Sequence, residues 1–210
     1  MSILQRNLKN SKMKIHNNLE QGSEEWHYVR KGKMTASNAT AIGNNGAGLK
    51  TYCKEIIRKE FSSNEERWSN KDTERGNELE PIARQIYEME TGNTVETVGF
   101  IEYEDEVGCS PDGLVGEDGG IEIKCPDDKV FFDYILDGED AISTDYIWQV
   151  QMNLLITERK WWDLIIYNPN FKKSMFIFRI YPNAEKFEKL KAGFEIGRNL
   201  LKEIRNKINE

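Results

Sequence analysis

Apolar residues recur at helical spacing in some stretches of the chain and alternate with polar residues in others. The helical stretches are 23–32, 49–57, 79–91, 144–156 and 183–208. The alternating stretches are 98–103, 107–110, 121–125, 161–167 and 175–181. This order predicts an α/β or α+β fold, in which a central mixed sheet receives an inserted helix and is flanked by further helices.

Individual residues indicate where the predicted helices begin and end. Ser23 is a predicted N-cap, and residues 35–39 begin a further helix. Gly92 supplies a left-handed stop, and the polar residues 62–72 are turn-like. Pro81 either opens its helix at the first position or kinks a longer one.

The length of 210 residues suits one compact domain. The first 20 residues are polar and poor in pattern, so we expect a loose arm over 1–20 and a single domain over 21–210. No stretch approaches the roughly 18 apolar residues of a membrane span, and the start lacks the apolar run of a secretion signal. A soluble, cytoplasmic protein without a membrane partner is therefore expected.

Cysteine and histidine are too few for several kinds of site. Cys53, Cys109 and Cys125 are odd in number and lack CxxC spacing, which predicts reduced thiols instead of disulfides or a four-thiolate metal centre. His16 and His27 are the only histidines, so a histidine-rich metal nuclease or a Ser-His-Asp hydrolase is poorly supported.

Charge is distributed unevenly along the chain, whose formal net charge is −7. Residues 1–60 carry 11 basic and 5 acidic side chains, residues 61–150 carry 6 and 24, and residues 151–210 carry 12 and 7. An acidic middle between basic flanks is compatible with a cation site that has DNA-facing residues on either side. Charge alone favours a solvated acidic surface, so motifs must decide.

The segment around Asp112 and Glu122 carries the most specific chemistry. Side chains alternate along a strand, so Glu122 and Lys124 are expected to share an exposed face while their apolar neighbours are buried. Such a pair is often a surface ion pair worth under about 1 kcal/mol. A hairpin that brings Asp112 beside Glu122 would instead create a site for a hard cation, with the Ile123 carbonyl as a further ligand. An EF-hand fails, because Ile123 stands where that loop needs Glu.

The remaining roles follow from such a metal site in a phosphodiesterase. Lys124 would orient the attacking water or help deprotonate it, and would offset charge on the phosphorane. Glu80, from the helix before the sheet, would hold a metal-bound water. Gln149, from the later helix, would hydrogen-bond the same water.

Together these residues resemble the PD-(D/E)xK nuclease superfamily and, more closely, the YqaJ-type viral recombinase family that includes lambda exonuclease. The motifs occur in family order over residues 20–170: Trp26-His27 and Arg30; Thr35-Ala36-Ser37; Gly76-x-x-x-Glu80-x-x-Ala83-Arg84; Cys109-Ser110-Pro111-Asp112-Gly113-Leu114; Glu122-x-Lys124-Cys125-Pro126; and Gln149-Val150-Gln151 before Thr157.

The resemblance implies a restriction-endonuclease-like core and a 5′-to-3′ exonuclease acting on double-stranded DNA ends. Mg²⁺, with Mn²⁺ as a substitute, would be the cofactor. The products would be mononucleotides and a 3′ overhang for a single-strand annealing protein, in phage or prophage recombination within a bacterial host. A homotrimeric ring around the DNA is also implied, and Arg30 and Ser37 would bind the 5′ phosphate.

Three positions depart from the family pattern. Lys71 falls where the family has a basic residue near the rim of the site, although the preceding stretch is shorter here. Thr73 replaces a bulky apolar residue that would separate the strands. The second arginine of the phosphate pocket is represented by Lys129, one place out of register, or else by Val130. The alternatives are another enzyme on the same core, an endonuclease or a resolvase, and a catalytically silent DNA-end-binding module.

Overall fold

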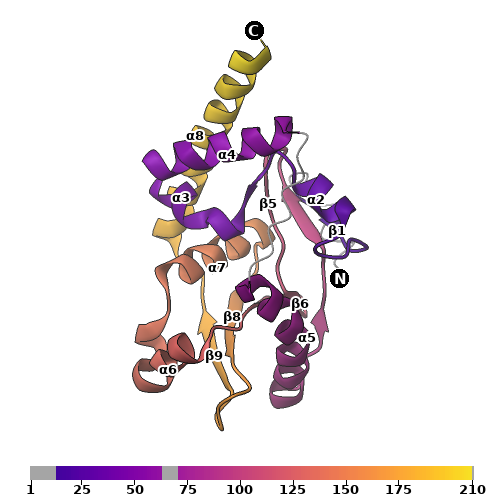
Figure 1. Ribbon diagram of the computed structural model, residues 1–210, viewed down its shortest axis with the longest axis vertical. Coiled ribbons are helices and arrows are strands. Elements are labelled where there is room, and N and C mark those ends of the chain that lie inside the picture. The colour runs from indigo at the N-terminus through magenta and orange to yellow at the C-terminus, as the bar shows by residue number, and fades with distance from the viewer. Residues whose placement is uncertain (1–12, 63–70, 210) are drawn as a thin grey trace.

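The computed structural model describes residues 13–62 and 71–209, apart from the side chains of residues 71–74. Two mixed sheets lie among helices (Figure 1). The predicted mixed α/β architecture is confirmed.

The larger sheet has the strand order β3-β6-β7-β8-β9. Its strands are Val95–Glu96, Gly113–Val115, Gly119–Lys124, Trp161–Tyr167 and Met175–Ile180. β7 and β8 run parallel, and the other neighbours are antiparallel. The sequence pattern did not predict the short strand β6. Its pairing of Gly113 with Ile121 sets the register between β6 and β7.

Parallel strands need a long crossover connection, and here it is helical. It comprises α6 (Asp128–Asp137), the 3-10 helix η2 (Gly138–Ala141) and α7 (Thr144–Thr157). α7 was predicted, whereas α6 was not, although Asp127 caps it by accepting a hydrogen bond from the Val130 amide. α7 is buried along most of its length and contacts the sheet on one side and α3 and α8 on others.

The smaller sheet has the order β1-β4-β5-β2, formed by Met13–His16, Phe100–Tyr103, Val107–Cys109 and Met34–Thr35. The expectation of a loose arm over 1–20 is wrong for β1, which pairs antiparallel with β4. Its polar side chains Lys14 and His16 both reach Glu102, a partner that local sequence pattern does not reveal. Residues 1–12 lie outside the described residues.

The remaining helices pack on these sheets or on one another. They are α2 (Glu24–Arg30), the 3-10 helix η1 (Ala36–Asn38), α3 (Ala39–Asn44), α4 (Ala47–Phe61), α5 (Lys71–Thr91) and α8 (Ala184–Asn209). Ser23 caps α2 as predicted. Pro81 lies inside α5, so the longer helix is the correct alternative. The turn expected over 62–72 is wrong for residues 71 and 72, which are helical, and residues 63–70 lie outside the described residues. Gly92, with φ +69°, follows α5 as predicted.

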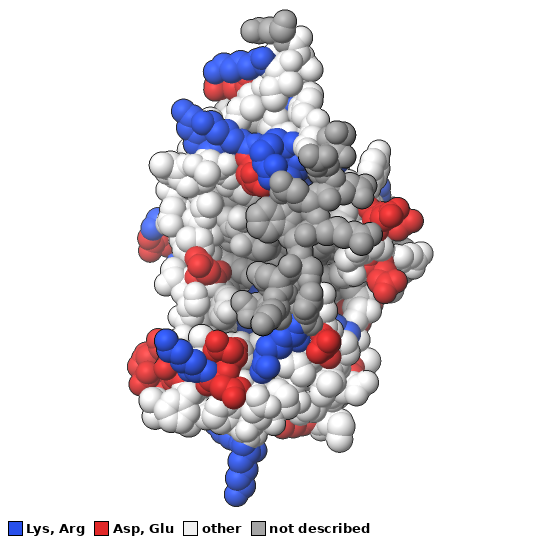
Figure 2. Space-filling view, viewed as in Figure 1, with Lys and Arg blue, Asp and Glu red and all other residues white. Residues whose placement is uncertain are grey.

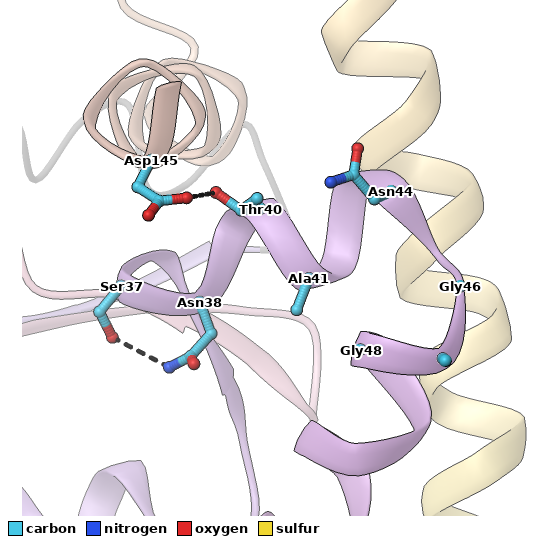
Figure 3. A pocket seen from close by; sticks show the side chains of 9 residues that line it. Ser37, Asn38, Thr40, Ala41, Asn44, Gly46, Gly48 and Asp145 are labelled. Carbon is cyan, nitrogen blue, oxygen red and sulfur yellow. Dashed lines mark hydrogen bonds between the residues drawn. The ribbon is translucent and has the colours of Figure 1, made fainter. Parts of the chain in front are cut away.

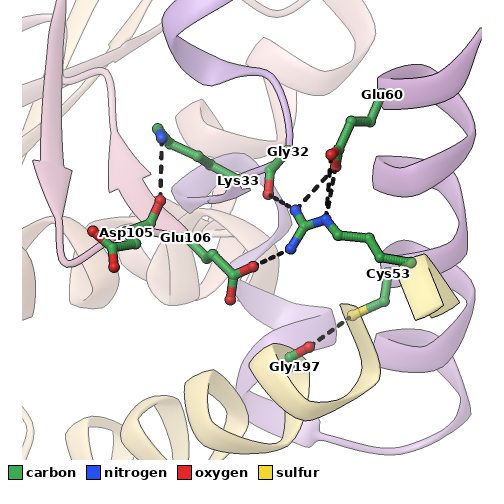
Figure 4. Close-up of polar contacts among 8 residues, drawn as sticks. Gly32, Lys33, Cys53, Glu60, Asp105, Glu106 and Gly197 are labelled. Atoms are coloured by element: carbon green, nitrogen blue, oxygen red, sulfur yellow. Dashed lines mark hydrogen bonds and ion pairs between the residues drawn. The ribbon is translucent and has the colours of Figure 1, made fainter. Parts of the chain in front are cut away.

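α8 packs against α3 and α4 through buried Leu190, Phe194 and Leu201. Near its end Arg205 donates hydrogen bonds to Glu60 of α4, to Glu106 before β5 and to the Gly32 carbonyl (Figure 4). The C-terminal helix is therefore part of the core, held by both apolar and ionic contacts. The three cysteines are free, as predicted.

Gly193→Ala is expected to destabilise the fold by about 2–4 kcal/mol, because a Cβ there would overlap the backbone carbonyl of Ile42 in α3. Urea unfolding followed by circular dichroism measures the change. Gly76→Ala is the matched control, since no atom of the described residues lies within 4 Å of a Cβ at that helical position. Equal stability of both variants would contradict the close packing of α3 on α8.

No helix in the described part of the chain is long and apolar enough to cross a membrane. Part of the acidic middle of the chain is a solvated face, as charge alone suggested. Figure 2 shows acidic side chains gathered at its lower left, where Figure 1 draws α6. The exposed acidic residues of α6 and its surroundings are Asp127, Asp128, Asp133, Asp137, Glu139 and Asp140.

Candidate active site

The β6–β7 hairpin sets Asp112 opposite Glu122. Because Gly113 pairs with Ile121 in antiparallel register, Asp112, which precedes Gly113, lies beside Glu122, which follows Ile121. Asp112 is fixed there because its Oδ2 accepts the Ile123 amide at 2.6 Å. The two predicted carboxylates therefore lie together, as the hairpin argument required.

Glu122 is the centre of a polar cluster between β7 and α7. Its Oε1 accepts hydrogen bonds from Lys124 Nζ at 2.8 Å and from Gln149 Nε2 at 2.5 Å. Its Oε2 accepts one from Asn153 Nδ2 at 3.0 Å, and Lys124 also donates to Gln149 Oε1 at 3.1 Å. The expectation of an exposed carboxylate is wrong, since Glu122 is only 2% exposed. The reason is α7, which covers this face of the sheet.

Glu80 joins the site from α5. Its Oε1 accepts a hydrogen bond from Arg84 at 2.5 Å, and its side chain is 29% exposed. Burial raises the pKa of Glu80, Arg84 opposes that rise, and Glu122 adds to it. The structure thus brings together all the residues predicted for catalysis: Glu80, Asp112, Glu122, Lys124 and Gln149.

The electrostatics of the site are those of crowded carboxylates. Burial, followed by the charges of Glu122 and Glu80, raises the pKa of Asp112 well above its ordinary value. Burial lowers the pKa of Lys124, but the charges of Glu122 and Asp112 outweigh it and leave that pKa raised. Lys124 is therefore an ammonium at neutral pH, which suits a hydrogen-bond donor and a counter-charge.

The donor set fits a hard divalent cation. Asp112, whose pKa is raised by burial and by the charge of Glu122, gains from a cation between the two carboxylates. Among the described residues the Oδ1 of Asp112 has no hydrogen-bond partner, so it is available as a ligand. Within the same residues no three or more His, Cys, Asp or Glu side chains converge as a ready-made metal group. The ligand set of Asp112, Glu122, the Ile123 carbonyl and water-mediated Glu80 stays a prediction.

Arg30, predicted to bind phosphate, lies next to the segment that carries Asp112. Its Nη1 donates to Ser110 Oγ at 2.8 Å, and its guanidinium stacks 3.9 Å from the ring centre of Trp26. Burial lowers the pKa of Arg30 to about 10. Across the described side chains it has no carboxylate partner. A largely buried cation without a counter-charge is suited to bind an anion.

Ser37, the second predicted phosphate ligand, lies at the edge of a cavity of about 530 Å³ (Figure 3). Residues of η1, α3 and the start of α4 line this cavity, together with Asp145 of α7. Asp145 accepts a 2.6 Å hydrogen bond from Thr40, which joins α3 to α7. Ser37 thus lines an open space that can hold part of a ligand.

The other predicted DNA contacts are not brought into this cluster. Lys129 and Val130 are both exposed on the first turn of α6. The side chains of Lys71 and Thr73 lie outside the described residues. Their predicted roles stay predictions.

Sequence reasoning gave no role to several residues of the site. Asn153 binds Glu122, and the Lys124 ammonium lies 5.2 Å from the ring centre of Tyr146. Tyr146, Gln149 and Asn153 recur at helical spacing, which puts them on one face of α7, so the signal is present in the sequence. Arg75 donates to the carbonyls of Cys125 and Pro126, just after β7, and no local pattern indicates that contact.

Known proteins place the chain in a family. A YqaJ-like viral recombinase domain matches residues 25–160. The alkaline exonuclease LHK-Exo from Laribacter hongkongensis is 32% identical, with 89% of this chain and 98% of that chain covered and a TM-score of 0.76. Its complex with dAMP gives 33% identity, the same coverage and a TM-score of 0.77.

A phage-related exonuclease from Haemophilus somnus 129PT shares the fold at 16% identity, with 84% of this chain and 96% of that chain covered and a TM-score of 0.65. No curated protein sequence matches. The fold is therefore that of exonucleases of this α/β class. The chain belongs to the YqaJ-like viral recombinase family.

Proposed function

We propose that the chain is a Mg²⁺-dependent exonuclease that degrades one strand of duplex DNA from its 5′ end, releases mononucleotides and leaves a 3′ overhang. The observation that carries the proposal is the cluster of Asp112, Glu122 and Lys124, in which two carboxylates and an ammonium converge beside Gln149. The likeness to LHK-Exo, which has been seen with a mononucleotide, dAMP, supports this activity and product.

The residues divide the chemistry between them. Asp112, Glu122 and the Ile123 carbonyl would hold the metal, with Glu80 in contact through water. A divalent cation supplies polarisation of the phosphoryl oxygens and a lowered pKa for bound water. Lys124 donates hydrogen bonds to the attacking water and stabilises charge on the pentacoordinate phosphorus. Gln149 and Asn153 keep Glu122 oriented.

The proposal also covers the oligomeric state of the protein and the place where it acts. We expect a homotrimeric ring around DNA, acting in the cytoplasm of a bacterial host and handing its 3′ overhang to a single-strand annealing protein. A ring would keep the enzyme on its duplex between successive hydrolysis steps.

Digestion of a duplex labelled on one strand, either at the 5′ or at the 3′ end, tests the polarity. The 5′ label should appear early as a mononucleotide and the 3′ label late, and a chelator should stop both. Early release of the 3′ label, or hydrolysis that persists without a divalent metal, would contradict the proposal.

Arg30→Ala is expected to reduce the preference for 5′-phosphorylated over 5′-hydroxyl ends by about 10- to 100-fold, the loss of a charge-assisted hydrogen bond. The measurement is the ratio of kcat/KM on the two kinds of end. Arg58→Ala removes an exposed arginine paired with Glu55 and serves as the control. A ratio that Arg30→Ala leaves unchanged would remove Arg30 from phosphate recognition.

A further inference from the structure

Three hydroxyl groups from different elements form a chain that ends at Ser37. Tyr52 of α4 accepts the backbone amide of Thr35 at 2.9 Å. The phenol oxygen also lies 3.2 Å from Thr35 Oγ1, which in turn lies 3.2 Å from Ser37 Oγ. Thr35 is buried, with 6% of its surface exposed. The first two hydroxyl groups are thus held in place by the fold.

One assignment of the protons in this chain leaves the Ser37 hydrogen for a ligand. In this assignment the Tyr52 oxygen accepts the Thr35 amide and donates its own proton to Thr35 Oγ1, a contact in which either oxygen can be the donor. Thr35 then donates its single proton to Ser37, which also accepts a longer hydrogen bond of 3.4 Å from Asn38 Nδ2. Ser37 keeps its own proton for a further acceptor. The chain therefore directs one hydroxyl proton out toward a ligand.

The surroundings of Tyr52 keep this arrangement intact. Burial raises the pKa of Tyr52, although its hydrogen bonds with Thr35 oppose the rise, so the phenol stays protonated and able to donate. Arg30 is near enough for its charge to act on Tyr52. Tyr52 therefore lies within range of the Arg30 charge and also belongs to the hydrogen-bond chain that ends at Ser37.

We propose that Tyr52 is a positioning residue for recognition of the 5′ phosphate: through Thr35 it orients the Ser37 hydroxyl as a donor to the phosphate that Arg30 binds. The inference rests on the proposed function and deepens it, since it assigns end specificity to a residue that touches neither DNA nor metal.

Tyr52→Phe is the test, with kcat and KM measured on duplexes that end in a 5′ phosphate or a 5′ hydroxyl. The variant loses one oriented neutral hydrogen bond, so kcat/KM on 5′-phosphate ends divided by kcat/KM on 5′-hydroxyl ends should fall about 3- to 10-fold. The change should lie in KM for the phosphorylated ends and not in kcat. Thr35→Val breaks the chain at its middle and should give the same fall. Tyr103→Phe, on a half-buried tyrosine of β4, is the matched control and should keep the parental ratio.

The outcomes separate this inference from the proposed function. If Arg30→Ala loses the preference while Tyr52→Phe and Thr35→Val keep it, the Tyr52 proposal is overturned and the phosphate pocket stands. An equal loss on both kinds of end would mean a structural role only and would also overturn it. If neither the parent nor Arg30→Ala distinguishes the two ends, the phosphate pocket fails and the Tyr52 proposal fails with it.

Discussion

Lys124→Ala is expected to lower the rate of DNA hydrolysis on the order of 10²- to 10³-fold while the protein still folds. Lys124 is the cation that contacts Glu122 and Gln149, at 2.8 and 3.1 Å. The substitution removes the donor to the attacking water and the counter-charge to the phosphorane. Single-turnover digestion of linear duplex at saturating enzyme measures the chemical step.

Two further variants make this result interpretable. Lys124→Gln can still hydrogen-bond to Glu122 but carries no charge, so it should fold at least as well as Lys124→Ala and remain nearly inactive. Lys160→Ala removes another lysine paired with an acid, Asp118, at the opposite end of the neighbouring strand β8, and should keep full activity. Hydrolysis by Lys124→Gln within about tenfold of the parent would exclude Lys124 from the catalytic machinery.

Asp112→Asn is expected to abolish metal-dependent hydrolysis, and yet to stabilise the metal-free protein by about 1 kcal/mol, or about 2–4 °C in melting temperature. The stabilisation arises because burial, followed by the charges of Glu122 and Glu80, disfavours the charged form of Asp112 and raises its pKa, a cost that an amide does not carry. The amide can still accept the hydrogen bond from Ile123. Calorimetric titration with Mg²⁺ and thermal unfolding in chelator give the two measurements.

The raised pKa of Asp112 also determines how the stability difference between Asp112→Asn and the parent changes with pH. A carboxyl whose pKa is raised by folding favours the folded state at low pH, and this contribution is lost as the pH rises through the folded pKa. The advantage of Asp112→Asn in chelator should therefore shrink as the pH falls from that raised pKa toward the ordinary value of an aspartate. Asp133→Asn, on the exposed surface of α6, should show neither effect. A metal-free Asp112→Asn variant that is less stable than the parent would refute the repulsion argument.

Part of the candidate site could be predicted from sequence because several of its members follow simple periodicities. Glu122 and Lys124 are two residues apart on one strand, and Gln149 and Asn153 are four apart on one helix. The burial of Glu122 could not be predicted, because it depends on α7 lying across that face of the sheet. Strand alternation specifies which residues share a face, and only tertiary packing specifies whether that face is covered.

Long-range polar contacts account for most of what sequence reasoning missed. Strand β1 is held to β4 partly by Glu102, whose position is 86 residues from His16. Arg30 and Tyr52 reach their partners Ser110 and Thr35 across the fold. Such contacts carry no periodic signal, so a sequence can show that an arginine is available but not what orients it.

The most direct test of the account compares a linear duplex with a covalently closed circle of the same sequence, each incubated with the chain and Mg²⁺. The account predicts that the linear duplex is converted to mononucleotides and single strands while the circle stays intact, because hydrolysis by Asp112, Glu122 and Lys124 must start at an end. Cutting of the circle would instead show an endonuclease on the same core. An absence of hydrolysis with either substrate, in Mg²⁺ and in Mn²⁺, would leave a protein that binds DNA ends without cleaving them.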